Sequence, residues 1–367
     1  MHLARLKLVQ FKNYDQQELI LSPRLNCFVG DNGMGKTNLL DAIHYLCMCK
    51  SHFSLPDRQV MQHSADFFRI EGDFERAQKK EAMVCTYTPR VRKTLSRNKV
   101  AYARLADHIG FLPLIMIAPD DTLLITDGSE NRRQFLDILL VQLNPKYLQQ
   151  LMTYNKVLQQ RNAYLKSFKH PSELDPTLLE IYNQQLLEPA QYIHQQRQAI
   201  VARLTPVFQQ YYKIISGDQE QVELLYYSQL AEQTLAELLL ESQEKDTWLQ
   251  RTTKGIHKDD LKLFINDYAV KKFASQGQLK SYLLALKLAQ YELLRQEAAL
   301  APLLLLDDIF DKLDNKRVEQ LLALLLERDF GQVFITDTHP HRVARIIEGL
   351  QADFKQFVIA NGQVVWE

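Results

Sequence analysis

The chain has 367 residues, of which 46% are apolar, so it can bury a sizeable core and form two or three domains or lobes. Lys with Arg and Asp with Glu each number 44, which excludes a globally basic surface and leaves nucleic-acid binding to a local patch. Four cysteines without a regular framework, no signal segment after Met1 and no apolar run near ~20 residues indicate a cytoplasmic protein with no membrane contact.

Strand patterns dominate the first third of the chain. Residues 6–11 alternate, with Leu6, Leu8 and Gln10 on one face and Lys7, Val9 and Phe11 on the other. Further strands are expected over 18–21 and 25–29, and the second of these leads into a loop and helix over 31–46. Residues 66–118 also predict mainly strands, with candidates at 68–70, 83–87 and 114–117.

From about Asn131 to Tyr212, Leu and other apolar residues recur at helical spacing. This predicts a helical arm, broken around His170-Pro171 and Asp175-Pro176. The remaining elements are a hairpin of 260–265 and 268–273, a helix over 278–296, buried strands at 303–306 and 333–336, and a C-terminal hairpin over 357–365.

The loop after the third predicted strand matches the pattern G-x-x-x-x-G-K-[ST]. Its glycines allow the backbone to wrap closely around phosphates, and the following helix adds its dipole. Lys36 is expected to reach the β and γ phosphates of ATP, and the Thr37 hydroxyl to bind Mg²⁺. The alternative is a glycine-rich turn with a solvated lysine. The predicted nucleotide-binding residues of this Walker A loop are Gly30, Asp31, Asn32, Gly33, Met34, Gly35, Lys36, Thr37 and Asn38.

Four leucines at 303–306 end in Asp307 and Asp308, which is typical of a Walker B strand. Asp307 is expected to hold Mg²⁺, directly or through water, and Asp308 to orient or deprotonate the attacking water, so Lys36 and Asp308 are the catalytic candidates. The alternative for the acidic pair is a helix N-cap.

Ser275-Gln276-Gly277-Gln278 stands directly before the long predicted helix. A Ser hydroxyl and a glycine backbone at a helix N-terminus can bind phosphate, although the same residues could be an N-cap and turn. One subunit cannot easily bring this helix end and the Walker A loop to the same γ-phosphate, whereas two subunits packed head to tail can. We therefore predict that Ser275, Gly277 and Gln278 complete the nucleotide site of a partner subunit.

These three motifs, in this order, resemble the ABC-type ATPase heads of the structural-maintenance-of-chromosomes class, and within it the RecF family of bacterial DNA repair proteins. The resemblance covers essentially the whole chain, and the stretches between the nucleotide motifs select RecF over transporter ATPases. These stretches are 132–137 (Arg-Arg-Gln-Phe-Leu-Asp), 160–163 (Gln-Arg-Asn-Ala) and 255–261 (Gly-Ile-His-Lys-Asp-Asp-Leu).

The resemblance implies an α/β fold, an ABC-type P-loop ATPase head with a mostly helical second lobe. The ATPase lobe is expected from residues 1–114 and 301–367, and the helical lobe from 115–300. It also implies an ATP-dependent homodimer with weak, DNA-stimulated hydrolysis of ATP. Such a protein binds gapped DNA or ss/dsDNA junctions, acts with RecR and RecO, and helps to load the RecA recombinase in DNA replication, recombination, repair and the SOS response.

By the same resemblance, Asp311 and Asp314 would couple the two nucleotide sites, His339 could be the switch histidine, and residues 119–121 could replace the glutamine loop. Asp308 stands where many ABC ATPases have Glu, and its shorter side chain leads us to expect slow hydrolysis. Two rival hypotheses stay open: a P-loop phosphotransferase acting on a small substrate, and the ATPase subunit of a membrane transporter.

Residues 86–106 carry six basic side chains and no acidic one. Such a cluster could contact DNA phosphates, protect a β-edge from pairing, or contact the ATP base and ribose. Arg132 and Arg133 could contact DNA or cap the first helix of the arm. The six basic residues are Arg90, Arg92, Lys93, Arg97, Lys99 and Arg104.

Overall fold

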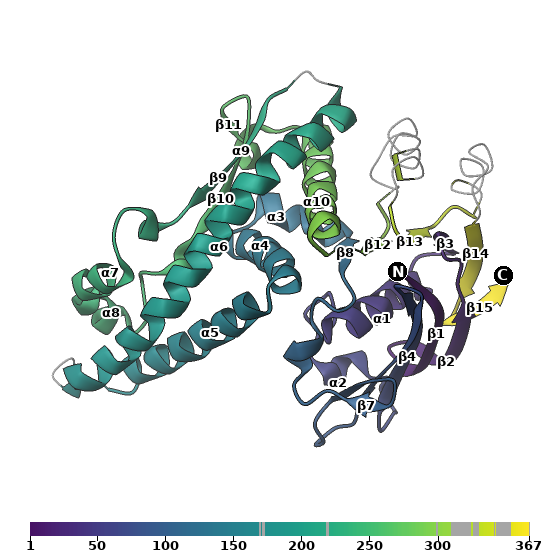
Figure 1. The fold of residues 1–367 in the computed structure, drawn as a ribbon, viewed down its shortest axis with the longest axis horizontal. Helices are drawn as coiled ribbons and strands as arrows, with labels where there is room; N and C mark the ends of the chain where they lie inside the picture. Colours follow the sequence, from purple (N-terminus) through teal and green to yellow (C-terminus); the bar gives the residue numbers. More distant parts are fainter. Residues whose placement is uncertain are drawn as a thin grey trace. The chain divides into compact units, whose positions relative to one another are not determined.

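The chain folds into two compact units, one of which contains both of its ends (Figure 1). The first unit comprises Met1–Asp121 and Leu284–Glu367, and the second comprises Thr122–Leu283. The lobe boundaries expected at 114/115 and 300/301 stay a prediction. The computed structural model describes residues 1–168, 170, 173–217, 220–298, 300–309, 324–325, 330–340, 342 and 354–366.

Two six-stranded sheets form the framework of the first unit. The antiparallel sheet has the order β2 (Tyr14–Ile20), β1 (His2–Phe11), β4 (Phe68–Arg76), β5 (Lys79–Tyr87), β6 (Thr94–Arg97) and β7 (Val100–Ala101). The other sheet has the order β15 (Gln363–Trp366), β14 (Phe354–Ala360), β3 (Leu25–Val29), β13 (Val333–Asp337), β12 (Leu303–Leu306) and β8 (Leu114–Ile117). Its strands run parallel except for β15, which pairs with β14 in antiparallel fashion.

Helix α1 (Lys36–Met48) contacts strands of both sheets and is the centre of the first unit's core. Its apolar residues, among them Leu39, Ile43 and Leu46, are fully buried. A helix that is apolar on most of its circumference is stable only when protein surrounds it, as here. The short helix α2 (Asp57–Val60) and the part of α10 (Gln276–Ala298) beyond Leu283 also belong to this unit.

The N-terminal strand departs from strict alternation. Phe11 was expected on the face opposite Leu6 and Leu8, but all three side chains are fully buried, so that expectation is wrong. Gln10 has φ 52°, which breaks the two-residue period and turns Phe11 into the core. Phe11 there meets the rings of Tyr45 and Phe68 edge to face.

The second unit is mainly helical and contains a three-stranded antiparallel sheet of order β11 (Tyr268–Ala269), β10 (Asp260–Ile265) and β9 (Val222–Tyr227). Helices α5 (Pro145–Leu165) and α6 (Pro176–Ser216) lie side by side in Figure 1, and the predicted break between them is confirmed. The predicted strand over 268–273 is wrong beyond Ala269. The helices of this unit are α3 (Leu123–Thr126), α4 (Ser129–Leu143), α5 (Pro145–Leu165), α6 (Pro176–Ser216), α7 (Leu235–Glu241), α8 (Gln243–Leu249), α9 (Val270–Phe273) and the start of α10.

The stretches that select the RecF family build buried polar contacts in this second unit. Arg161 pairs with Asp246 at 2.8 Å, and both side chains are fully buried. The Arg161 guanidinium also donates to Thr252 Oγ1 and Asn183 Oδ1. Arg197 of α6 bonds in the same way to both Asp137 and Asp259, at 3.0 Å each. These ion pairs therefore tie α4, α5 and α6 to the chain that precedes β10.

Removing one partner of the Arg161–Asp246 pair should destabilise the second unit. Arg161→Met keeps an apolar stem but leaves a buried carboxylate without its cation, which costs about 3–5 kcal/mol. Urea unfolding followed by circular dichroism measures this loss. Lys245→Met, at the exposed neighbour of Asp246, is the control and should change stability by less than about 0.5 kcal/mol. A loss below about 1 kcal/mol for Arg161→Met would contradict the assigned role of the pair.

Acid should weaken the first unit through His108. Burial lowers the pKa of this side chain from 6.5 to about 4, and its Nε2 lies 2.8 Å from the Leu46 carbonyl oxygen. Because the unfolded chain takes up a proton near pH 6.5 and the folded chain only near pH 4, stability should fall between these values, by about 3 kcal/mol for this group. His108→Gln should remove that share of the pH dependence, as measured by unfolding at pH 7 and pH 4.5. An unchanged slope would show that His108 is not buried as a neutral ring.

Candidate functional site

The predicted strand, glycine loop and helix of the Walker A motif are present in the first unit. β3 ends at Val29, the loop follows, and Gly35 is the N-cap of α1 with φ 112°. Lys36 lies at the start of α1, and its Nζ donates to the carbonyl oxygens of Gly30 (2.6 Å) and Asp31 (2.8 Å). The loop thus holds its own lysine by backbone carbonyls, while Asp31, Asn32 and Gly33 are exposed.

Gly30 has to be a glycine for two reasons. Its φ is 146°, and a Cβ there would lie 2.3 Å from the carbonyl oxygen of Ile359 on β14. Its N–H donates to the Asp337 carbonyl at the end of β13, 3.3 Å away. The loop therefore begins between two neighbouring strands of the parallel sheet.

Parallel pairing brings the two Walker motifs together. β12 and β3 both pair with β13, so their carboxyl ends lie at one edge of the sheet. There the Thr37 hydroxyl donates to Asp307 Oδ1 at 2.9 Å across 270 residues of sequence. Burial is the main cause that raises the pKa of Asp307, whereas its hydrogen bonds from Thr336 and Thr37 lower it.

Thr336 is a site residue that the sequence did not single out. Its hydroxyl donates to Asp307 Oδ1 (2.8 Å) and accepts from the Asp308 N–H (2.8 Å), so it holds the carboxylate of Asp307 and the backbone of Asp308. Thr336 ends a short apolar run that was expected to be a strand. A hydroxyl group at the end of that strand is the feature of the sequence that could have identified it as a site residue. Asp308 itself has φ 48°, a conformation that Asp tolerates and most side chains avoid.

Two other predicted nucleotide-binding residues, Met34 and Asn38, form hydrogen bonds with Asn13. The Asn38 side chain donates its Nδ2–H to Asn13 Oδ1 at 2.7 Å. Met34 offers its carbonyl oxygen to the Asn13 side chain at 3.1 Å. Both contacts are made with Asn13 in the β1–β2 turn, so the Asn38 side chain and the Met34 carbonyl have partners outside the loop.

Ser275, Gly277 and Gln278 lie in the second compact unit, at the start of α10. The Ser275 N–H donates to Gln278 Oε1 (2.7 Å), and the Gln278 N–H donates to Ser275 Oγ (3.3 Å). This reciprocal pair has the form of a capping box. Ser275 is exposed, so its hydroxyl remains at the surface while it caps the helix.

The structure places some of the remaining candidates from the resemblance, and their roles stay predictions. His339 follows β13, and its side chain is 70% exposed. Residues 119–122 form a short 3₁₀ helix after β8, where Asp121 pairs with Lys287 at 2.6 Å. Asp311 and Asp314 lie outside the described residues.

Half of the basic cluster at 86–106 is already paired. Lys93 lies 3.0 Å from Asp57, Arg97 2.6 Å from Glu81, and Arg104 2.7 Å from Asp107. Arg90, Arg92 and Lys99 are exposed. A DNA contact through this cluster would therefore use these three side chains first.

Arg132 and Arg133 have structural partners within the second unit. Arg132 pairs with Asp260 at 2.6 Å and donates to the Asp127 carbonyl oxygen at 3.0 Å. Arg133 donates to Ser129 Oγ and to the Asp259 carbonyl oxygen. Both side chains thus fasten α4 to the residues around β10, and neither the DNA contact nor the helix cap expected for them is tested by these contacts.

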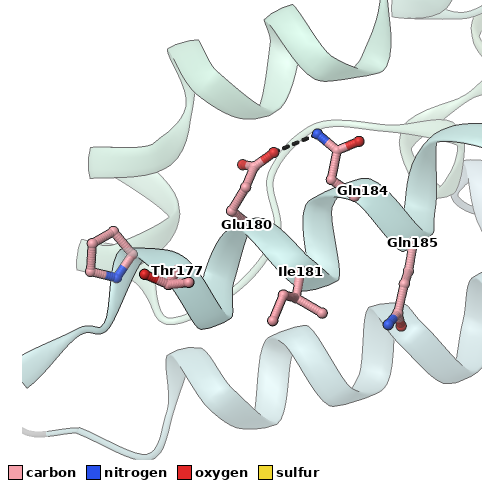
Figure 2. Close-up of a pocket in the computed structure, with 6 residues that line it drawn as sticks. Thr177, Glu180, Ile181, Gln184 and Gln185 are labelled. Atoms are coloured by element: carbon pink, nitrogen blue, oxygen red, sulfur yellow. Dashed lines mark hydrogen bonds between the residues drawn. The ribbon is translucent and has the colours of Figure 1, made fainter.

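An open groove lies at the N-terminal end of α6 (Figure 2). None of the predicted site residues lines it, and Glu180 is its one charged side chain. Glu180 accepts a hydrogen bond from Gln184, which lies one turn further along α6. The groove is lined by Pro176, Thr177, Glu180, Ile181, Gln184 and Gln185.

Among the described residues, no helix combines the length and the hydropathy that are needed to cross a bilayer. All four cysteines are buried and carry free thiols.

Comparison with known proteins identifies the family of this chain. A family model described as the RecF/RecN/SMC N-terminal domain matches residues 2–356. The DNA replication and repair protein RecF of Parabacteroides distasonis is 44% identical, and the alignment covers 99% of both chains. The same protein of Flavobacterium johnsoniae is 44% identical, with 97% of this chain and 99% of the relative covered.

Solved structures give the same result. The recombination mediator protein RecF of the RecFOR pathway, with ATPγS, matches with a TM-score of 0.89 and 27% identity over 99% of this chain and 97% of that chain. An Smc head domain from Pyrococcus furiosus matches with a TM-score of 0.56 and 14% identity, over 98% and 93% of the two chains, and shares the fold alone. These matches confirm the resemblance and favour the first of the three hypotheses. The chain belongs to the RecF family, a group of ABC-type ATPase heads related to those of the structural-maintenance-of-chromosomes proteins.

Proposed function

We propose that this chain binds ATP and Mg²⁺ at the Walker A loop. The hydrogen bond from Thr37 to Asp307 carries the proposal, because it places two oxygen atoms suited to Mg²⁺ within 2.9 Å of each other beside Lys36. RecF structures with ATP and with ATPγS, each 27% identical to this chain, support it. Bound Mg²⁺ would neutralise phosphate charge, and a cation beside the buried Asp307 would favour its ionised form.

The second element of the proposal is an ATP-dependent homodimer. Ser275 is exposed at the N-terminus of a helix of 23 residues, a place where backbone N–H groups and the helix dipole favour anions. In the dimer, Ser275, Gly277 and Gln278 of one subunit would face the phosphates held by Lys36 of the other. Each subunit would then hold half of two composite sites.

Hydrolysis in this dimer is proposed to be slow. Asp308 would orient the attacking water, and Thr336 holds its backbone N–H at 2.8 Å. An Asp side chain is one methylene shorter than the Glu of many ABC ATPases, so its carboxylate reaches less far. Slow, DNA-stimulated turnover would suit a clamp that opens after a delay, and we expect kcat well below the ~10 s⁻¹ of an ordinary enzyme.

The proposed biological role is recombinational repair. The relatives are DNA replication and repair proteins, and the solved RecF belongs to the RecFOR pathway. We infer that this chain, in the cytoplasm, binds gapped DNA or ss/dsDNA junctions, cooperates with RecR and RecO, and helps to load RecA. The exposed Arg90, Arg92 and Lys99 would supply phosphate contacts that do not depend on sequence.

The dimer proposal predicts different outcomes for two variants in analytical ultracentrifugation with ATP and Mg²⁺. Lys36→Ala should weaken ATP binding at least about tenfold, since it removes a charge that contacts phosphate, and so prevent dimerisation. Ser275→Arg should bind ATP as a monomer yet fail to dimerise. Thr234→Arg is the matched control, because Thr234 is also an exposed N-cap in a capping box, and it should dimerise normally. Dimerisation of Ser275→Arg at wild-type affinity would refute the composite site.

The DNA proposal predicts a change in salt dependence. Replacing Arg90, Arg92 and Lys99 by Ala should reduce the slope of log affinity against log salt for a gapped duplex by about 2–3, since each phosphate contact contributes about 0.7–0.9. Fluorescence anisotropy at several salt concentrations with ATP measures the slope. A triple Ala variant of Lys156, Lys166 and Lys245, all exposed in the second unit, removes equal charge as a control. Equal slopes for the two triple variants would exclude the basic cluster at 86–106 as a specific DNA contact.

A further inference from the structure

The phosphate loop is held from outside by two turns that are distant from it in sequence. Met34, in the middle of the loop, has a carbonyl oxygen that accepts from Asn13 Nδ2 (3.1 Å) and from the Gly362 N–H (3.0 Å). The Asn361 N–H lies 3.3 Å from the Met34 sulfur. Asn13 belongs to the β1–β2 turn, and Asn361 with Gly362 forms the β14–β15 turn.

The two turns also touch each other, and the contact leaves no space for a Cβ atom at the glycines that take part in it. Gly362 has φ 72°, and a Cβ at this position would lie 2.3 Å from the Asn13 carbonyl oxygen. A Cβ at Gly35, where φ is 112°, would lie 2.5 Å from Asn13 Nδ2. Gly362 thus meets the backbone of the first turn, and Gly35 of the loop meets the Asn13 side chain.

Successive carbonyl groups of the loop are bound on this outer side. The Met34 carbonyl takes the two bonds above, and the Gly35 carbonyl accepts from the buried Tyr14 hydroxyl at 3.0 Å. In a trans peptide the C=O and the following N–H point in opposite directions, and the described chain has no cis peptide bond. Fixing these carbonyls outward therefore turns the N–H groups of Gly35 and Lys36 to the opposite side, where an anion can accept from them.

A loop with three glycines is costly to order when a ligand arrives. Gly30, Gly33 and Gly35 all have positive φ, and glycine loses more backbone freedom than any other residue when it is fixed. Contacts that hold the loop beforehand reduce this loss on binding and so raise affinity without touching the ligand.

We propose that the Asn361–Gly362 turn, together with Asn13, is a positioning element that sets the affinity of the phosphate loop for nucleotide. The turn of the C-terminal hairpin would thereby affect the affinity for ATP through the conformation of the loop, without itself contacting the nucleotide. The inference rests on the proposed ATP binding and assigns a role to residues that the Walker motifs do not include.

The test compares two glycine variants in the full-length chain. Gly362→Ala should displace the turn, because the new Cβ meets the Asn13 carbonyl, and should raise the Kd for ATP and the KM for hydrolysis about tenfold. Because a preformed loop favours the bound ground state and the transition state equally, kcat should stay within about twofold. Gly217→Ala is the matched control, since Gly217 has φ 83° and its Cβ would meet no atom of the described residues within 4 Å. It carries the same backbone strain and should leave Kd and KM unchanged.

A melting curve for each variant separates positioning from general instability. Should Gly362→Ala not fold, Asn13→Ala takes its place, because it removes the other donor to the Met34 carbonyl without adding volume. Wild-type Kd in whichever of the two variants folds would overturn the positioning role. A fall in kcat with KM unchanged would also overturn it. Failure of the wild-type chain to bind ATP would instead refute the proposed function itself.

Discussion

Strand β13 pairs along its length with β3 and on its other side with β12, and the nucleotide-site geometry depends on this parallel pairing. The pairing places the carboxyl ends of three strands at one edge, so that Gly30, Asp307 and Asp337 are neighbours. Thr37 and Asp307 are 270 residues apart in sequence, and this pairing is what brings their side chains into contact. One buried sheet thus converts two distant motifs into one site.

The same sheet explains why the C-terminal hairpin contacts the phosphate loop. β14 pairs with β3 on the side opposite to β13, so the turn after β14 reaches the loop after β3. The loop is consequently held at Gly30 and Met34, while Asp31, Asn32 and Gly33 remain exposed. Asp337 holds Gly30 on one side, while Gly362 and Asn13 hold Met34 on the other. A phosphate site made mostly of backbone needs such support, because glycines provide no side chains to fix it.

The second unit uses its distinctive stretches differently. Arg132, Arg161 and Asp259 are prominent in the sequence and could have been functional, but each is engaged in a buried or half-buried ion pair or hydrogen-bond network. A buried ion pair is weak evidence for stability, although losing one partner is strongly destabilising. Stretches that are typical of a family can therefore owe their residues to buried contacts. The exposed Ser275, in contrast, is proposed to contact the nucleotide of a partner subunit.

The sequence by itself determined what depends on neighbours in the chain. The strand, loop and helix around Lys36, the break between α5 and α6, the all-apolar β12 and the Asn361–Gly362 turn were predicted correctly, since period, turn residues and an eight-residue motif are local. The resemblance of the ordered motifs also gave the family. Local patterns were insufficient at Phe11, where one residue with positive φ reversed the faces, and at Val270–Phe273, which forms a helix.

Only the tertiary structure decided which distant groups meet. Thr336 contacts Asp307 because two parallel strands end together, and Gly362 contacts Met34 because β14 lies beside β3. Lys93 and Arg97 form ion pairs with Asp57 and Glu81, which lie 36 and 16 residues away in sequence. Strand register and charge pairing are set by packing between segments far apart in sequence, and local periodicity carries no information about that packing.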